Sequence, residues 1–166
     1  PMHTEHFGVT LSALRNLLSN IDNIVAVGTT SVRTLESLSA LAWRIKCCGD
    51  AECERVIGQW ELYDIPAEFG GREALHTLIE YMEQRELTQM KAATQIMITP
   101  LGYHFRIVRY IITNFHQPKS TLLLLVSAYV GEDWHRIYDY ALANGFRFLS
   151  YGDSSLLKVD RAEPTT

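Results

Sequence analysis

The chain has 166 residues, of which 47% are hydrophobic and 20% charged, and its net charge is -4 at neutral pH. This length is sufficient for one domain with a substantial core. The acidic balance excludes a protein that binds nucleic acid through a general basic coat, but it leaves room for a local basic track. The longest apolar run, Leu122–Val126, is too short to cross a bilayer, so we expect no membrane partner.

Three cysteines, Cys47, Cys48 and Cys53, lie in one segment without the spacing of a zinc site or a disulfide framework. They are typical of reduced thiols, so we expect a cytoplasmic protein with no metal site. The first seven residues have the pattern of a strand interior, which suggests a piece of a longer protein.

The first half of the chain predicts alternating strands and helices. Alternation over residues 2–9 predicts a strand, followed by a helix over residues 10–20 that Thr10 caps. A short β-branched run, "NIVAVG", predicts a buried parallel strand. The next helix begins in "VGTTSVRTLES" and extends to about Lys46, with Val32, Leu35, Leu38, Ala42 and Ile45 facing inward.

Residues 47–93 form the least periodic part, and we interpret them as a loop-rich insertion that also contains a helix at about residues 72–86. "ATQIMI" and "YHFRIVRYIIT" predict two strands of a hairpin joined by "TPLG". Two further helices are predicted, in "TLLLLVSAYVG" and "EDWHRIYDYALANG", before a last strand in "FRFLSYGD".

These elements predict a single α/β domain over residues 1–160, with a disordered tail at residues 161–166. We expect a mixed, mostly parallel sheet or a partial barrel with flanking helices. In such folds chemistry collects where strands give way to helices. Three polar turns fit that position, namely "GTTSVR", "TNFHQPKS" and "SYGDSS", and we expect them to meet along one edge.

The turn "GTTSVR" has the composition of an anion-binding helix start. Thr29, Thr30 and Ser31 offer hydroxyl groups beside unpaired helix N–H groups, and Arg33 adds a forked cation. Positive charge is disfavoured in a first helical turn, so we expect Arg33 to have a specific anionic partner there. The alternative is an ordinary cap, with Arg33 paired to Glu36 on the surface.

The turn "TNFHQPKS" repeats this pattern, since Ser120 or Thr121 can cap the next helix. Asn114 and His116 would extend from the strand end toward a ligand. Imidazole titrates near neutrality, so His116 is the first candidate for a general acid or base. The alternative is a histidine that bonds a backbone carbonyl in a packed turn.

The remaining candidates are more scattered. His3 and Glu5 share a strand face, where the carboxylate could orient the imidazole, although a solvated pair is the alternative. Asp153 beside Tyr151 could bind a sugar hydroxyl or cap a turn. His104 and three further cations form a modest track that could follow RNA or could be half-exposed strand charges: Arg106, Arg109 and Lys119.

Together, "MHTE", "VGTTSVRTLES", "TNFHQPKSTLLLLVSAYVG" and "FRFLSYGDSSLL" resemble the carboxyl-terminal part of the S-adenosylmethionine:tRNA ribosyltransferase-isomerase (QueA) family of queuosine biosynthesis. The resemblance implies a fragment of a larger two-domain enzyme. That enzyme transfers the ribosyl part of S-adenosylmethionine to 7-aminomethyl-7-deazaguanine in the tRNA anticodon loop. Epoxyqueuosine forms and adenine and methionine leave, so S-adenosylmethionine is a consumed substrate and no cofactor is implied.

The resemblance also assigns roles. His116 becomes the first candidate for the base and Glu5 with His3 the second, while Arg33 and the hydroxyls beside it would bind the methionine carboxylate or a tRNA phosphate. An unstacked base could stack on Tyr151, Phe115 or Tyr103. Family members are about twice the length of this chain, so the isolated chain could be inactive. Their corresponding connection is shorter than residues 47–93, which would make that segment an insertion.

Two other functions fit the same residues. One is an RNA- or nucleotide-binding α/β module without catalysis, and the other is a different sugar-phosphate enzyme. Adenine release from S-adenosylmethionine distinguishes turnover from binding. We expect a monomer in either case.

Overall fold

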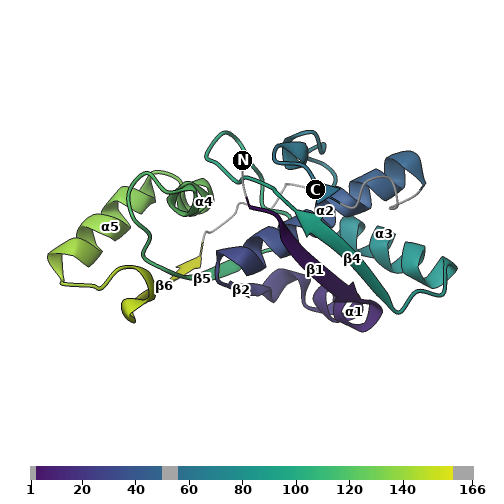
Figure 1. Ribbon diagram of the computed structural model, residues 1–166, viewed down its shortest axis with the longest axis horizontal. Helices are drawn as coiled ribbons and strands as arrows, with labels where there is room; N and C mark the ends of the chain where they lie inside the picture. Colours follow the sequence, from purple (N-terminus) through teal and green to yellow (C-terminus); the bar gives the residue numbers. More distant parts are fainter. Residues whose placement is uncertain (1–2, 50–55, 159–166) are drawn as a thin grey trace.

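The computed structural model describes residues 3–49 and 56–158 and forms a mixed α/β fold, as the sequence predicted (Figure 1). The strands are β1 (Glu5–Thr10), β2 (Val25–Val27), β3 (Val56–Ile57), β4 (Gln89–Thr94), β5 (Tyr110–Asn114) and β6 (Ser154–Lys158). The helices are α1 (Leu11–Ser19), α2 (Thr29–Cys48), α3 (Gly71–Gln84), α4 (Thr121–Val130) and α5 (Asp133–Ala143). Three short 3-10 helices, η1 (Ile21–Asn23), η2 (Glu61–Tyr63) and η3 (Leu149–Tyr151), complete the described elements.

The strands form two three-stranded sheets instead of one, in the orders β1-β4-β3 and β2-β5-β6. Each sheet contains one antiparallel and one parallel pairing: β1 with β4 and β5 with β6 are antiparallel, whereas β3 with β4 and β2 with β5 are parallel. The sheets are therefore mixed, and parallel pairs do not dominate either of them.

The predicted hairpin around "TPLG" is wrong. β4 ends at Thr94 and β5 begins at Tyr110, and these two strands lie in different sheets. The chain between them is fixed by side chains, because Tyr63 contacts Thr99 and Glu36 accepts backbone N–H groups from residues 106–108. These partners are distant in sequence, so local turn composition could not reveal them.

Helices α1 and α4 each begin directly after a residue whose side chain caps the first turn. Thr10 accepts a hydrogen bond from the N–H of Ala13 and begins α1, as predicted, and Ser120 does the same for Leu123 in α4. The last strand is displaced from its prediction. Residues 146–153 form a loop and η3 instead, and the strand starts at Ser154, because Asp153 accepts the backbone N–H of Arg147 and closes a turn.

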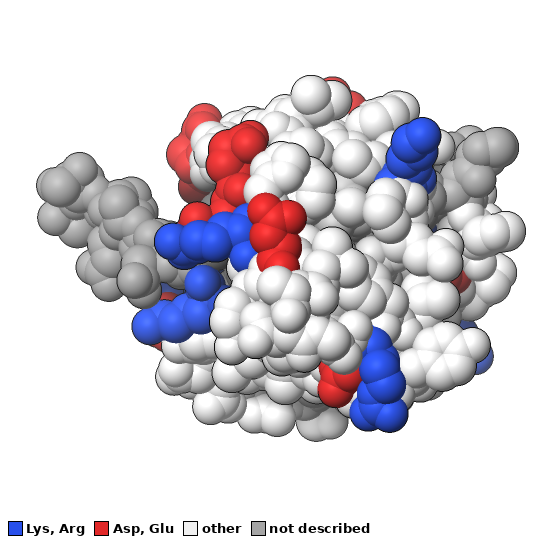
Figure 2. All heavy atoms as spheres, turned by 90° about the vertical axis from the view of Figure 1, so that its left-hand side faces the viewer, with Lys and Arg blue, Asp and Glu red and all other residues white. Residues whose placement is uncertain are grey.

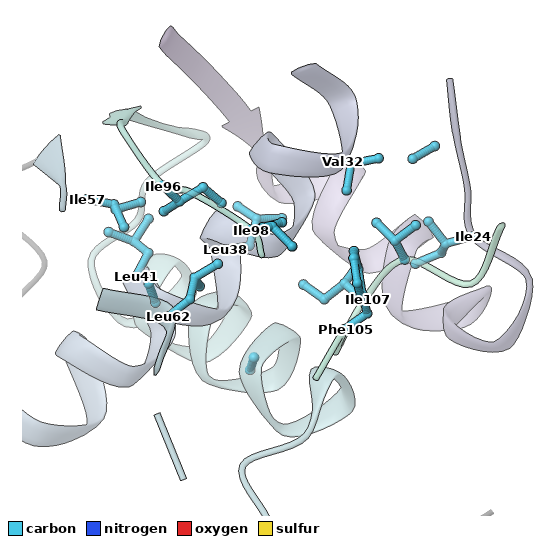
Figure 3. Packing of buried hydrophobic residues seen from close by; sticks show 14 of the residues in the cluster. Ile24, Val32, Leu38, Leu41, Ile57, Leu62, Ile96, Ile98, Phe105 and Ile107 are labelled. Atoms are coloured by element: carbon cyan, nitrogen blue, oxygen red, sulfur yellow. The ribbon is translucent and has the colours of Figure 1, made fainter. Parts of the chain in front are cut away.

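Helix α2 joins the two sheets, since it contacts β2 of one and both β3 and β4 of the other. Its Leu38 and Leu41 pack among Ile57, Leu62 and Ile96, while Val32 lies nearer Ile24 and Ile107 (Figure 3). Four of the five apolar residues predicted to face inward are buried, and Leu35 is half-buried. One hydrophobic core thus supports both sheets and fixes the start of α2 between them.

The described part of residues 47–93 belongs to this core. It supplies β3, α3 and β4, and β4 is the central strand of its sheet. Helix α3 packs on both α1 and α2 through buried Ala74, Leu75, Leu78 and Met82. The predicted tail at residues 161–166 and Cys53 lie outside the described residues.

Candidate active site at one edge of a sheet

Sheet β2-β5-β6 brings the three polar turns to one edge. Strands β2 and β5 are parallel, so Gly28 and Asn114 leave the sheet on the same side, and the N–H of Gly28 bonds the carbonyl of Ile112. Strand β6 is antiparallel to β5 and pairs Ser154 with Asn114. The turn before β6, with Tyr151 and Asp153, therefore starts from that edge too. The expected convergence of these turns follows from the strand order.

The start of α2 has no side-chain cap. Gly28 is the N-cap residue with φ 84°, a backbone conformation that favours glycine. The Ser31 hydroxyl donates to the carbonyl of Val27 at 2.7 Å, and the Thr30 hydroxyl donates to Glu5 at 3.2 Å. Thr29 is half-buried beside them. The first N–H groups of α2 are thus left without a capping hydroxyl.

Arg33 is buried, with 4% of its surface exposed, and its guanidinium is fully engaged. Nε donates to the carbonyl of Ile96 at 3.0 Å, one Nη lies near the carbonyl of His3 at 3.3 Å, and the other pairs with Glu5 at 3.0 Å. Burial lowers the pKa of Arg33, and the Glu5 carboxylate opposes that effect. The cation is stable in the first turn because it joins α2 to the other sheet.

This geometry bears on two interpretations of Arg33. It forms no surface pair with Glu36, which is itself fully buried and bonds other groups. Its guanidinium is also occupied by groups of the chain itself, so the predicted contact of Arg33 with a carboxylate or phosphate stays a prediction. In this structure Arg33 holds Glu5.

The contacts of Arg33 and Thr30 fix the position of the Glu5 carboxylate. Its Oε1 accepts from both Arg33 and Thr30, while its Oε2 is buried and has no hydrogen-bond partner among the described residues. Its side chain as a whole is 28% exposed. His3, the other predicted member of the pair, is exposed, and it contributes its backbone carbonyl to Arg33. A half-exposed carboxylate with one committed oxygen can accept a proton or a ligand hydrogen bond.

His116 is buried behind the turn that follows β5. Its Nε2 lies 2.8 Å from the Thr113 hydroxyl, and its backbone N–H donates to the Tyr138 hydroxyl at 3.0 Å. Burial lowers the pKa of His116, so the ring is neutral at physiological pH. Asn114 and Thr121 are exposed at the same turn, and Ser120 caps α4.

The turn before β6 is held by an ion pair. Asp153 accepts from the backbone N–H of Arg147 at 2.6 Å and from its Nε at 3.1 Å, and these bonds lower the pKa of Asp153. Tyr151 is exposed and free of neighbouring rings in the described residues, whereas Phe115 and Tyr103 are buried and unavailable for stacking. Of the three predicted stacking residues, Tyr151 alone is accessible.

The predicted cationic track is not continuous. Arg106 is buried at 7% exposure, and its guanidinium donates to the carbonyls of Phe69 and Ile65, so its RNA contact is corrected to a structural role. Arg109 is half-buried and donates to the carbonyl of Ile21, whereas Lys119 is exposed. On the face toward α5, Lys and Arg side chains are scattered and several lie beside Asp and Glu (Figure 2).

Sequence reasoning missed the role of Glu36. Its carboxylate accepts from the Tyr103 hydroxyl at 2.6 Å and from three successive backbone N–H groups at 2.8–3.0 Å, those of Arg106, Ile107 and Val108. Burial and the Glu36 charge raise the pKa of Tyr103 well above its usual range. The sequence offered no signal for this role, because Glu36 was expected on the surface as a partner of Arg33 and its actual partners are distant in sequence.

Neither a membrane-spanning helix nor a metal-binding cluster occurs among the described residues. Over residues 3–49 and 56–158 no helix is long and apolar enough to span a membrane. The same part of the chain contains no group of three or more His, Cys, Asp or Glu side chains placed to hold a metal ion.

Comparison with known proteins identifies the family. The model of the queuosine biosynthesis protein family matches residues 1–157. The chain belongs to this family. It is 37% identical over 150 residues to the S-adenosylmethionine:tRNA ribosyltransferase-isomerase of Rhizobium meliloti, covering 90% of this chain and 30% of that protein. The Brucella anthropi enzyme of the same name is 56% identical over 75 residues, covering 44% of this chain and 20% of that protein.

A solved structure agrees with the fold of this chain. The crystal structure of S-adenosylmethionine tRNA ribosyltransferase from Thermotoga maritima has a TM-score of 0.57 and 28% identity, and the match covers 91% of this chain and 40% of that one. The chain thus spans 20–30% of these two curated relatives and less than half of this solved structure. It carries a part of the family fold.

Proposed function

We propose that this chain supplies the Glu5 side of the active site of an S-adenosylmethionine:tRNA ribosyltransferase-isomerase. Relatives of that name match 90% of the chain, and the family model matches nearly all of it. The observation that carries the proposal is the Glu5 carboxylate, held by Arg33 and Thr30 beside an uncapped helix start at a sheet edge. Ligands of α/β proteins bind at such edges.

Glu5 is assigned as the general base. The reaction removes a proton from the ribose carbon bonded to the sulfonium sulfur, and the neighbouring positive charge makes that proton acidic. The carboxylate of Glu5, whose side chain is 28% exposed, takes this proton while Arg33 and Thr30 stay bound to it. The ribosyl group joins the amine of the deazaguanine base, and adenine and methionine leave as products.

The other turns are assigned to substrate binding. Thr29 and the N–H groups at the start of α2, including that of Ser31, would hold the methionine carboxylate, because an uncapped helix start favours an anion. Asn114 and Asp153 would bond ribose hydroxyls from the neighbouring strand ends. His116 is buried and bonded to Thr113, so we assign it to positioning the turn that carries Asn114.

The partner is the anticodon loop of a tRNA, whose unstacked bases can be splayed into a pocket. Exposed Tyr151 is the stacking candidate, with Lys119 and Arg109 near phosphates. Thr121 at the start of α4 and Ser120 before it complete this rim. The protein would act in the cytoplasm, with S-adenosylmethionine as a consumed substrate.

The test uses the complete enzyme, meaning this chain joined to the family sequence that relatives carry outside the matched region. We expect Glu5→Gln to lower the rate of adenine release from S-adenosylmethionine by about 100-fold or more, with KM changed only a few-fold. Glu83→Gln is the matched control, because Glu83 lies in an exposed ion pair with Arg15. Its activity should equal that of the unsubstituted enzyme.

Near-normal turnover of Glu5→Gln would reject Glu5 as the base. Binding of tRNA without any adenine release in the unsubstituted complete enzyme would reject catalysis and favour the non-catalytic binding module.

A further inference from the structure

The start of β1 and the end of β4 lie side by side, where their pairing stops (Figure 1). Glu5 and Thr94 form the last pair, and the same register would place His3 opposite Ile96. Arg33 takes the place of that next pair, because its guanidinium donates to the carbonyls of His3 and Ile96 at 3.3 and 3.0 Å. The orientation of the Ile96 carbonyl therefore helps to determine where Arg33, and with it Glu5, can lie.

A buried pair of hydroxyl groups holds Ile96 in that orientation. The Ser37 hydroxyl of α2 donates to Oγ1 of Thr94 at 2.7 Å, and the same oxygen accepts the backbone N–H of Ile96 at 3.2 Å. All three residues are 0% exposed, so water cannot replace either bond. The hydroxyl pair thus binds the N–H of the residue whose carbonyl accepts from Arg33.

The other edge of this segment is held by β3 and the residues that follow it. The backbone N–H groups of Gln95 and Met97 donate to the carbonyls of Ile57 and Gln59, both at 2.9 Å. Ile96 lies between these two bonds. The segment is therefore bonded on both edges, and the hydroxyl pair together with Arg33 attaches it to α2.

We infer that Thr94 and Ser37 are positioning residues for the reaction, which act on Glu5 through Ile96 and Arg33. Both are fully buried, so they act without touching a substrate. The inference rests on the proposed function, in which Glu5 is the base. Removing the Thr94 hydroxyl leaves the Ile96 N–H without its acceptor, so Arg33 loses a fixed carbonyl and Glu5 shifts. A displacement of about 1 Å at a reacting group can cost about 100-fold in rate.

The test measures adenine release from S-adenosylmethionine in the complete enzyme. We expect Thr94→Val, which keeps the shape of the side chain, to lower kcat about tenfold with KM changed less than about twofold. Thr94→Ser restores the hydroxyl and should return kcat to within about threefold of the unsubstituted value. Ser37→Ala leaves Oγ1 of Thr94 in place for Ile96, so we expect kcat to fall by a smaller factor, about threefold.

Ser39→Ala is the matched control for Ser37→Ala. Ser39 lies on the same helix and is equally buried, but its hydroxyl has no hydrogen-bond partner among the described residues. Its kcat should equal that of the unsubstituted enzyme. Thr10→Ala controls for lost stability, because it removes the cap of α1 at the far end of β1. Its resistance to urea should fall while kcat stays unchanged.

Glu5→Gln, measured beside these variants, separates the inference from the proposed function. A slow Glu5→Gln with Thr94→Val and Ser37→Ala at the unsubstituted kcat would overturn the inference and leave the base in place. So would Thr94→Ser as slow as Thr94→Val, a loss confined to KM, or equal kcat values for Ser37→Ala and Ser39→Ala. Near-normal turnover of Glu5→Gln would reject the base and the inference with it. Where circular dichroism shows that Thr94→Val does not fold, the comparison of Ser37→Ala with Ser39→Ala decides.

Discussion

Helices α2 and α4 follow two neighbouring strands of one sheet and begin in turns of similar composition, yet their polar side chains have different structural roles. Helix α4 starts with a Ser120 cap and continues as an almost wholly apolar segment. Helix α2 starts without a side-chain cap and buries Arg33, Glu36, Ser37 and Ser39. A conventional cap accompanies a helix that packs mainly through apolar side chains, whereas α2 directs the charged groups of Arg33 and Glu36 to partners distant in sequence.

Those partners explain how the site is held. Arg33 bonds Glu5 and the carbonyls of His3 and Ile96, all associated with the other sheet. Glu36, one turn later, bonds the chain at residues 103–108. The polar half of α2 therefore fixes the position of the sheet edge where Glu5 lies. Four substitution experiments, in order of decreasing expected effect, test this difference between α2 and α4.

Removing Glu36 should destabilise the protein most. Glu36→Ala leaves the Tyr103 hydroxyl and three buried N–H groups without an acceptor. We expect the free energy of unfolding in urea to fall by about 4–5 kcal/mol. Glu83→Ala, which removes an exposed ion pair, should cost less than about 1 kcal/mol. Similar losses for the two variants would show that the buried network contributes no more than a surface pair.

Arg33→Ala should have the next largest effect. It leaves Glu5 and two backbone carbonyls without their donor, and we expect a loss of about 2–4 kcal/mol, reduced because Glu5 is partly exposed. In the complete enzyme kcat should fall more than KM rises, since Arg33 positions Glu5. Arg33→Lys keeps the charge and should restore part of kcat. A change confined to KM would indicate that Arg33 binds a substrate directly.

The two helix starts themselves can be compared by removing hydroxyl groups. Ser120→Ala should cost about 1 kcal/mol, because the Leu123 N–H loses its acceptor. Thr29→Ala should cost less than about 0.5 kcal/mol, because no side chain caps α2. Thermal or urea unfolding measures both. Equal costs would mean that the uncapped start of α2 depends on Thr29 after all.

The smallest expected effect is that of His116 on the pH dependence of stability. Burial lowers its pKa in the folded state below the ordinary 6.5, so the unfolded chain binds a proton more readily. The His116 contribution to stability is complete above pH 6.5 and is lost as the pH falls toward the folded-state pKa. Unfolding measured over this range should show His116→Gln with a weaker decline than the unsubstituted protein. Identical slopes would contradict the buried neutral ring.

The sequence predicted the helices better than it predicted which strands pair with each other. Apolar spacing of 3.6 residues located α1, α2, α3 and α5, because that period depends on neighbours within the helix, and a nearly continuous apolar segment located α4. Pairing depends on residues far apart, so the hairpin at "TPLG" was wrong, and the sheet divided in two. The edge shared by the turns after β2 and β5 was predictable, since parallel strands end on the same side. The third turn reaches this edge because β6 follows it and pairs antiparallel to β5, which the sequence did not predict.

Individual site residues were harder to predict for the same reason. Spacing within α2 suggested that Arg33 and Glu36 pair with each other, but Arg33 bonds Ile96 and Glu36 bonds Tyr103, each more than 60 positions away. Sequence alone left open whether Arg106 and His116 are buried, because their strand and turn could equally have faced solvent. Burial was decided by packing between distant segments.

A crystal structure of the complete enzyme with S-adenosylmethionine tests the central assignment most directly. The account predicts the ribose carbon next to the sulfonium within about 4 Å of a Glu5 carboxylate oxygen, with the methionine carboxylate at the start of α2. Arg33 should retain its bond to Glu5 in that complex. A ligand bound away from the edge formed by β2, β5 and β6, or an Arg33 that has left Glu5 to hold the carboxylate itself, would contradict it.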